Sequence, residues 1–295
     1  MPQGTWVDRQ APVRLQPYLR LARVDRPIGT WLLLLPCWWS VALASPGWPD
    51  LWMLALFAIG SIVMRAAGCA INDIADRNFD GKVARTALRP IPSGQITVLQ
   101  AILFLGALLL IGLLVLVQFN TFTVVTGMLS LVLIAIYPFT KRITYWPQLA
   151  LGLTFNWGAL LGWTAVRGDL GLPALALYAA GVFWTLGYDT IYAHQDKEDD
   201  MMIGVKSTAI KFGTATRAWL YGFYALSVAL LALAGWFAQL HGSFYAILAL
   251  GAAHLVWQAA KVDTENAKDC LAKFKTNRDF GIIVLAAILS GRLAG

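Results

Sequence analysis

The fold is decided by residues 51–80, where an apolar stretch, LWMLALFAIGSIVMRAAGCAI (51–71), runs directly into an acidic one, NDIADRNFD (72–80). A helical membrane span needs about 20 mostly apolar residues, and residues 51–71 meet that length. Asp73 and Asp80 are seven positions apart, and Asp76 and Asp80 are four apart. On a helix these offsets fall on one face, so the run would aim several carboxylates in one direction at the end of the span.

A second acidic run, DTIYAHQDKEDD (189–200), repeats this spacing. Asp189 and Asp196 are seven positions apart, and Asp196 and Asp200 are four apart. The loops that follow the two runs also match, because VARTALR (83–89) and VKSTAIK (205–211) both read V-x-x-T-A-(L/I)-(R/K). The paired runs and loops predict an internal duplication.

Composition indicates an integral membrane protein. The chain is 58% hydrophobic and 13% charged, with a mean hydropathy of +0.63, whereas soluble domains are about 45–50% apolar and about 25% charged. An outer-membrane barrel would show alternating strands of about 10 residues, which the sequence does not contain. We therefore expect an all-α fold. The net charge of +7 does not indicate nucleic-acid binding, because the basic residues lie in loops between apolar segments.

Nine apolar segments predict nine transmembrane helices. Their approximate ranges are 27–45, 51–71, 96–117, 121–138, 147–166, 172–188, 215–238, 243–260 and 279–294. Spans 1–4 and 5–8 would form two parallel four-helix halves, about 27–142 and 143–262, and the ninth helix would complete the wall of a central cavity. Residues 1–26 would be a cytoplasmic N-terminal segment, and residues 27–295 a single transmembrane domain.

The basic residues predict the orientation in the membrane. All Lys and Arg residues except Arg65, Arg167 and Arg292 lie in the N-terminal segment or in the loops after even-numbered spans. By the positive-inside rule that face is cytoplasmic. Four spans separate the two acidic runs, and an even number returns the chain to the same side. Both runs are therefore expected at the cytoplasmic face, where they can meet.

Aspartates that converge at one site require a counter-ion. The two runs contain seven: Asp73, Asp76, Asp80, Asp189, Asp196, Asp199 and Asp200. Hard oxygen ligands suit Mg²⁺, which usually binds through a few carboxylates together with substrate phosphates. A diphosphate bridged by Mg²⁺ is thus the expected ligand. The alternative is that the carboxylates are solvated loop charges, but the paired spacing with Asn72 attached favours a site.

Arg65 stands apart from the other cations because it lies within the second apolar segment. It precedes Asp73 by about two helical turns, or roughly 12 Å. An arginine at the membrane centre costs about 2.5–3.5 kcal/mol on insertion scales. We therefore expect it to face the protein interior and an acidic or anionic partner, the alternative being that it snorkels to the interface.

The cysteines indicate neither a disulfide framework nor a zinc site. Cys37, Cys69 and Cys270 are odd in number and widely separated. Free cysteine is usually buried, so we expect all three to be small core residues.

Several motifs resemble those of one known family. The sequences N-D-x-x-D-x-x-x-D at 72–80 and D-x-x-Y-A-x-x-D-x-x-x-D at 189–200 resemble the two aspartate-rich motifs of the UbiA superfamily of membrane prenyltransferases. Further agreement comes from DRPIG (25–29), MRAAGC (64–69), RPIPSG (89–94) and YPFTKR (137–142). Together these motifs are similar to the branch of the family that uses 4-hydroxybenzoate as acceptor, and the similarity covers nearly the whole chain.

The resemblance implies a reaction and a cofactor. A polyprenyl diphosphate would be ionised with the help of Mg²⁺, and the carbon ortho to the phenol of 4-hydroxybenzoate would capture the allylic cation, giving a ubiquinone precursor. Other acceptors of the superfamily, namely dihydroxynaphthoate, homogentisate, chlorophyllide and haem, stay open. A cation-dependent transporter is the alternative from another class. Apart from the substrates and the lipid bilayer, no partner is indicated.

The resemblance also assigns roles to residues. The metal ligands would be Asn72, Asp76, Asp80, Asp196 and Asp200, although Glu198 or Asp199 could replace a carboxylate of the second run. The expected catalytic residues are Asp73 and Asp189, which would support the cluster or position the aromatic substrate, and Arg142, the first choice for the benzoate carboxylate. Arg65 is the second choice for that role, Lys141 and Arg77 are candidates for the diphosphate, and Tyr192 would line the pocket.

The N-terminal residues bear on location. No short apolar core with a cleavage site precedes the first apolar segment, so we expect no cleaved secretory signal. Residues 1–26 contain Asp8 and Asp25 and look little like a transit peptide. We therefore expect a multi-pass membrane protein with its active site toward the cytoplasm. A bacterial inner membrane is favoured, and a mitochondrial inner membrane stays open.

Overall fold

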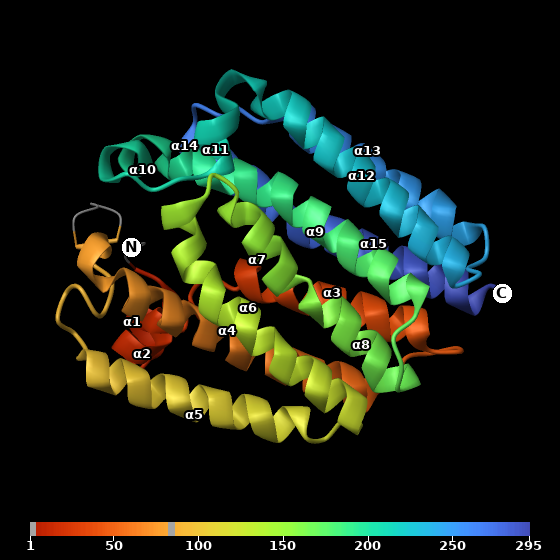
Figure 1. Ribbon diagram of the computed structural model, residues 1–295, viewed down its shortest axis with the longest axis horizontal. Helices are drawn as coiled ribbons and strands as arrows, with labels where there is room; N and C mark the ends of the chain where they lie inside the picture. The colour runs from red at the N-terminus through yellow and green to blue at the C-terminus, as the bar shows by residue number, and fades with distance from the viewer. Residues whose placement is uncertain (1–3, 82–85) are drawn as a thin grey trace.

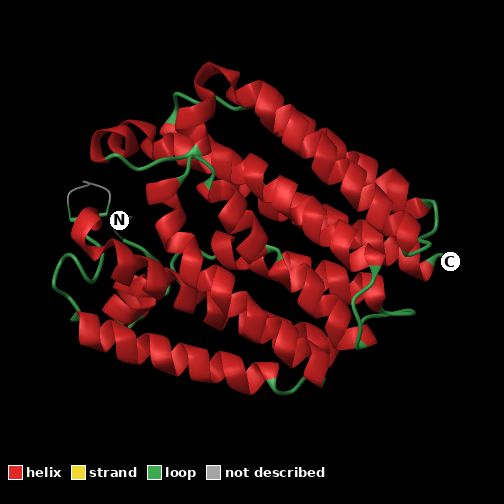
Figure 2. Cartoon of the chain, viewed as in Figure 1, coloured by secondary structure: helices red, strands yellow, loops and turns green. Residues whose placement is uncertain are grey.

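The computed structural model describes residues 4–81 and 86–295. For residues 78–80 it describes the backbone alone. Throughout this part of the chain the secondary structure is helical, without a strand (Figures 1 and 2). The all-α prediction is confirmed.

Each of the nine apolar segments expected from the sequence is helical. The apolar helices are α3 (Ile28–Ala44), α4 (Leu51–Asp80), α5 (Val98–Leu116), α6 (Thr121–Ile143), α7 (Pro147–Phe155), α8 (Trp157–Arg167), α9 (Leu172–Ala193), α12 (Thr216–Phe237), α13 (Ser243–Lys261) and α15 (Asn277–Leu293). The fifth segment is interrupted at Asn156 and so forms two helices, α7 and α8.

Six helical stretches in the described part of the chain are long and apolar enough to cross a membrane. They are Leu51–Arg77, Val98–Leu116, Thr121–Ile143, Pro147–Arg167, Thr208–Phe237 and Ser243–Lys261, and the apolar helix α3 is shorter. These stretches support an integral membrane protein. The count of nine transmembrane helices and the parallel arrangement of the two halves stay predictions.

Short helices gather at one end of the bundle. They are α1 (Trp6–Gln10), α2 (Gln16–Leu21), η1 (His194–Asp196), α10 (Lys197–Ile203), α11 (Thr208–Phe212), η2 (Gly213–Ala215) and α14 (Ala267–Lys275). In Figure 1, α1, α2 and α10 lie at the left, whereas α15 ends at the right. Most basic residues belong to the N-terminal segment and to the loops that were predicted to share one membrane face.

The second acidic run does not form one continuous helix, although the spacing of its aspartates was interpreted on that assumption. Helix α9 ends at Ala193, a 3-10 turn covers His194–Asp196, and α10 begins at Lys197. Despite this break, Asp189, Asp196 and Asp200 all line one cavity, as the spacing predicted. The first run does continue α4 as a helix through Asp80.

An aromatic cluster joins α3, α9 and α15 at the core. The rings of Trp39 and Trp184 lie 5.1 Å apart, and those of Trp184 and Phe280 5.4 Å apart. The indole Nε1 of Trp39 donates to the Gly281 carbonyl at 2.7 Å, and that of Trp184 to Oδ1 of Asn277 at 2.8 Å. Both buried indoles are thus hydrogen-bonded, as buried tryptophans require.

Cys37, Cys69 and Cys270 are buried and free, which confirms their expected role as core residues. In contrast, α5 buries Ala101 alone among its residues. Its exposed face carries Leu99, Leu103 and Leu110, and α5 forms the lower edge of the bundle in Figure 1. Such an apolar face is typical of a surface that contacts lipid.

Two glycines of α8 bring this helix close to α3. A Cβ at Gly158 would lie 2.3 Å from Sγ of Cys37, and one at Gly162 would lie 2.6 Å from the Cys37 carbonyl oxygen. Small residues at membrane helix interfaces allow such approach of two backbones.

We predict that Gly162→Ala lowers the thermal stability of the purified protein. The added methyl group would meet backbone atoms of α3 that cannot move aside, and overpacking of this kind costs about 1–3 kcal/mol. The matched control is Gly106→Ala in α5, where an added Cβ meets nothing within 4 Å. Thermal unfolding of both variants in one detergent measures the difference, and equal midpoints would contradict the close α3–α8 contact.

Candidate functional site

The two acidic runs line one polar pocket at the left end of the bundle. The cavity has a volume of about 390 Å³ and is bordered by α4, the end of α6, the start of α7, the end of α9, α10 and the loop before α11. Eight of the expected site residues line it: Asn72, Asp76, Lys141, Arg142, Asp189, Tyr192, Asp196 and Asp200. Both runs therefore contribute to one pocket, as the sequence predicted, and the membrane face on which it lies stays a prediction.

Asp76 ties α4 to α6 through two cations. Its carboxylate accepts a hydrogen bond from Nζ of Lys141 and lies 3.3 Å from Nη2 of Arg142, and its side chain is only 2% exposed. The same Nη2 donates to the Ala75 carbonyl at 2.9 Å. The pocket therefore combines carboxylates and cations, and a carboxylate buried to this degree requires such pairing.

Asp73 is placed differently, although it is only three residues earlier on the same helix. It is fully buried and is not among the residues that line the polar pocket. Nη2 of Arg23 approaches its two oxygens at 2.8 and 3.1 Å, and Nη1 of Arg89 lies 3.1 Å from Oδ1. Asp73 thus lies behind the pocket wall, held by two arginines.

The second run contributes some of its acidic residues to the pocket. Asp196 and Asp200 line it, whereas Glu198 and Asp199 do not. His194 faces away, since its Nε2 lies 3.0 Å from Oγ1 of Thr216. Burial, followed by the charge of Lys197, lowers the pKa of His194 to about 4, so this ring is neutral at neutral pH.

Two expected substrate-binding residues lie outside the polar pocket. Arg65 is directed into the protein, where its guanidinium lies 5.3 Å from the ring centre of Phe155 and fills the space beside Gly29. This orientation agrees with the interior position expected for Arg65. Arg77 is exposed, and its Nη1 donates to the Ile74 carbonyl at 2.8 Å. The side chain of Asp80 lies outside the described residues.

The pocket also contains residues that sequence reasoning did not assign to it. They are Thr86, Arg89, Tyr137, Pro138, Pro147, Gln148, Ala193, Ile203, Gly204, Val205, Lys206 and Ser207. Lys206 is tied to α6, because its backbone N–H donates to the Lys141 carbonyl at 2.9 Å. Arg89 and Lys206 lie in the matching loop segments 83–89 and 205–211, respectively. This sequence match could have indicated that both residues belong to the site.

The donor set of the pocket fits a hard divalent cation, because carboxylate and amide oxygens predominate. Among the described residues, no group of three or more His, Cys, Asp or Glu side chains lies close enough to hold an ion alone. Mg²⁺ usually keeps several waters and binds through one or two carboxylates plus substrate phosphates. The pocket is therefore suited to an ion that arrives with an anionic substrate.

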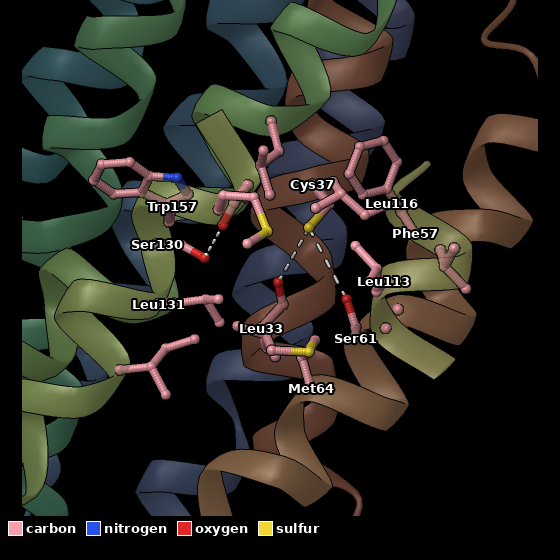
Figure 3. Close-up of a pocket in the computed structure, with 18 of the residues that line it drawn as sticks. Leu33, Cys37, Phe57, Ser61, Met64, Leu113, Leu116, Ser130, Leu131 and Trp157 are labelled. Atoms are coloured by element: carbon pink, nitrogen blue, oxygen red, sulfur yellow. Dashed lines mark hydrogen bonds between the residues drawn. The ribbon is translucent and has the colours of Figure 1, made fainter. Parts of the chain in front are cut away.

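An apolar cavity of about 370 Å³ lies further along α4 and α6 (Figure 3). Met64 of α4 lines it, eight residues before Asn72 of the polar pocket, and Ile134 of α6 lines it, three residues before Tyr137. The two cavities therefore follow one another along the same helices. Around Cys37, Figure 3 shows mainly apolar side chains, with Ser61 and Ser130 as the labelled hydroxyls.

Solved structures show the same fold. A UbiA homolog from Aeropyrum pernix K1, solved in its apo form, matches with a TM-score of 0.74 and 26% identity over 88% of this chain and 96% of that one. A UbiA homolog from Archaeoglobus fulgidus, solved with GPP and Mg²⁺, matches with a TM-score of 0.66 and 20% identity over 95% of this chain and 100% of that one. The second likeness concerns the fold alone.

Curated relatives are similar over nearly the whole chain. The protein named 4-hydroxybenzoate polyprenyltransferase, mitochondrial, is 51% identical in Arabidopsis thaliana over 98% of this chain and 72% of that protein. Its counterpart in Mus musculus is 55% identical over 97% of this chain and 78% of that protein. The counterpart in Homo sapiens is 52% identical over 96% of this chain and 77% of that protein. These relatives are named as mitochondrial proteins, so the bacterial inner membrane favoured from the sequence is not confirmed.

The match to the family itself spans most of the chain. The model of the UbiA prenyltransferase family matches residues 33–282, a range that includes both acidic runs and both cavities. With the curated relatives at more than half identity, it confirms the resemblance carried by the motifs. The chain belongs to the UbiA prenyltransferase family.

Proposed function

We propose that this protein transfers a polyprenyl group from polyprenyl diphosphate to the 3-position of 4-hydroxybenzoate, an early membrane step of ubiquinone biosynthesis. One observation carries the proposal: both aspartate-rich runs line a single pocket with several cations, in a chain that shares more than half of its residues with proteins of that name. The C–O bond to the diphosphate breaks, a ring carbon bonds to the allylic carbon, and the ring loses a proton.

The diphosphate requires positive charge as its oxygens become the leaving group. Lys141 and Lys206 line the pocket and supply ammonium groups for these oxygens. Asn72, Asp76, Asp196 and Asp200 would hold Mg²⁺, together with Asp80. When bound, Mg²⁺ supplies Lewis-acid stabilisation of the leaving diphosphate. Because Lys141 and Arg142 already pair with Asp76, these cations keep the carboxylate buried and oriented before substrate arrives.

The acceptor needs a cation for its carboxylate and a site for the ring proton. Arg142 lines the pocket and has a planar fork that can engage a carboxylate through two hydrogen bonds. Arg65 is the second candidate, at the interior side of the site. The phenol activates its own ring, so a strong base is not required. Asp189, which lines the pocket, positions the phenol or accepts the proton, as released diphosphate also can.

The apolar cavity is the proposed place of the isoprenoid tail. It lies along the same helices as the polar pocket, and its wall consists mainly of Leu, Met, Phe and Gly residues. An amphiphilic donor needs an oxyanion site followed by an apolar path, and burial of hydrocarbon contributes about 25 cal/mol per Å². α4 and α6 supply the two environments in that order.

We predict that Asp76→Ala and Asp196→Ala abolish Mg²⁺-dependent prenyl transfer in membranes. Each change removes a carboxylate expected to hold the ion, and Asp76→Ala also removes the carboxylate that pairs with Lys141 and Arg142. Turnover with radiolabelled 4-hydroxybenzoate, with and without Mg²⁺, measures the effect. The control is Glu265→Ala, an exposed carboxylate that lies 3.8 Å from Nζ of Lys197. Unchanged turnover in both aspartate variants would remove the metal assignment.

We predict that Arg142→Ala raises the KM for 4-hydroxybenzoate more than the KM for the prenyl donor. Loss of a charge-assisted hydrogen bond costs about 1.5–3 kcal/mol, or roughly 10-fold to 150-fold in affinity. Steady-state kinetics with each substrate varied in turn separate the two constants, and Arg278→Ala, an exposed arginine beside Asp279, is the control. The reverse pattern would assign Arg142 to the diphosphate.

We predict that Ser130→Phe shifts donor preference toward short chains. Ser130 lines the apolar cavity, and a phenyl ring there would occupy space needed by a long tail. The ratio of kcat/KM for geranyl diphosphate to that for a long polyprenyl diphosphate should rise several-fold. The control is Leu103→Phe on α5, whose side chain is exposed. An unchanged ratio would place the tail elsewhere.

A further inference from the structure

The N-terminal segment, residues 4–22, packs against a helix that is otherwise largely exposed. Leu21 of α2 shares a buried cluster with Ala101 of α5, and Figure 1 shows α1 and α2 beside the left end of α5. On the same part of α5, Leu99 and Leu103 are each 66% exposed. Exposed leucines on a membrane span contact lipid tails. The segment therefore lies at the edge of a lipid-facing surface.

Contacts with α5 determine the depth of the segment in the membrane. Nη1 of Arg20 donates to Oε1 of Gln95, just before α5, at 3.1 Å. The rings of Tyr18 and Phe104 lie 5.4 Å apart, and Val98 is the first residue of the apolar span. Phe104 follows it by six residues, so at 1.5 Å per residue the ring contact lies about 9 Å inside the start of the span. Interfacial segments bury their apolar side chains by about 5–10 Å, and α2 lies at that depth.

The segment exposes large apolar side chains. Val13 is 80% exposed, Leu15 51% and Trp6 46%. Exposure of these side chains to water would be unfavourable, because apolar surface is stabilised by its removal from water. At the level of the headgroups the same side chains contact lipid, and tryptophan is enriched there in membrane proteins. The apolar surface of residues 4–22 thus suits the membrane interface.

The segment also carries cations that its own acidic residue does not neutralise. Asp8 is the one acidic residue among residues 4–22, and it pairs with Arg20. Arg9 and Arg14 are exposed, and neither belongs to an ion pair within the described part of the chain. Arginines beside the headgroups are attracted to anionic lipids. Apolar and basic side chains together therefore favour an anionic bilayer surface.

We propose that residues 4–22 form a membrane-binding element at the interface, which inserts its exposed apolar side chains among the headgroups and binds anionic lipid phosphates through Arg9 and Arg14. The occupant is the bilayer rather than another protein, because the segment adjoins the exposed leucines of α5 and lies at the depth of the headgroups. Residues 4–22 thus rest on the membrane instead of extending into the aqueous phase. The inference does not depend on the reaction in the polar pocket.

Spin-label accessibility in lipid nanodiscs measures this depth in the full chain. The labelling variants are Leu15→Cys in the segment, Leu103→Cys on α5 and Glu265→Cys, whose native side chain is 77% exposed. The native cysteines are buried, and the unaltered chain gives their background. Collisions with a neutral, water-soluble nickel complex should be several-fold rarer at position 15 than at 265, and rarest at 103. Equal accessibility at positions 15 and 265 would overturn the inference.

Anionic lipid tests the role of the two arginines. The label in Leu15→Cys should be less accessible to the nickel complex in nanodiscs with phosphatidylglycerol than in nanodiscs of phosphatidylcholine alone. Adding Arg9→Gln and Arg14→Gln should remove that difference. Arg278→Gln is the matched control, since Arg278 is an exposed arginine that pairs with Asp279, and it should keep the difference. The same lipid dependence with and without the two arginines would overturn their role.

Two further measurements keep the test decisive. Dipolar broadening between labels at position 15, in nanodiscs that hold two copies of the chain, would assign the surface to contact between copies and overturn the lipid occupant. Thermal unfolding in detergent identifies a Leu15→Cys chain that fails to fold, and Val13→Cys then takes its place. Because no measurement requires prenyl transfer, failure of the proposed function and failure of this inference are distinguishable.

Discussion

Carboxylates brought together in one cavity repel one another, so each must be paired with a cation or share one. At the polar end of this bundle the pairing also fixes the architecture. Asp76 joins α4 to α6 through Lys141 and Arg142, and Asp73 joins α4 to the N-terminal segment and to the following loop through Arg23 and Arg89. The electrostatic requirement of the site thereby ties the N-terminal segment, the following loop and α6 to α4.

Helices α4 and α6 also connect two kinds of environment. Their ends beside the loops carry the charged groups of the polar pocket, and their middle portions line an apolar cavity. The core of the bundle is formed elsewhere, by the aromatic cluster of α3, α9 and α15.

Much of the fold followed from the sequence, because helical spans have a required length and apolar composition. All nine apolar segments are helical, and counting spans between the acidic runs predicted that both would reach one pocket. The break at Asn156 was not predicted, since the apolar run continues through it without proline or charge. The turn at His194–Asp196 was missed for a similar reason, because the spacing of the aspartates fits a continuous helix.

The sequence predicted which types of residue form the site, but it did not predict which cation pairs with each aspartate. Asp73 and Asp76 lie in the same motif, yet one is behind the pocket and the other lines it. The spacing of the aspartates on a helix predicts which way each side chain points. Their partners, which are Arg23, Arg89, Lys141 and Arg142, come from positions between 16 and 66 residues away in the sequence.

The ion pairs of the first run have a consequence for how the protein is made. Arg23, Arg89, Lys141 and Arg142 all precede residue 143, so the partners of Asp73 and Asp76 are synthesised before the second acidic run. Domains of larger proteins form from the N-terminus as the chain emerges. The first half of the bundle can thus neutralise its buried carboxylates during insertion, and the second half completes a binding site whose first wall is already in place.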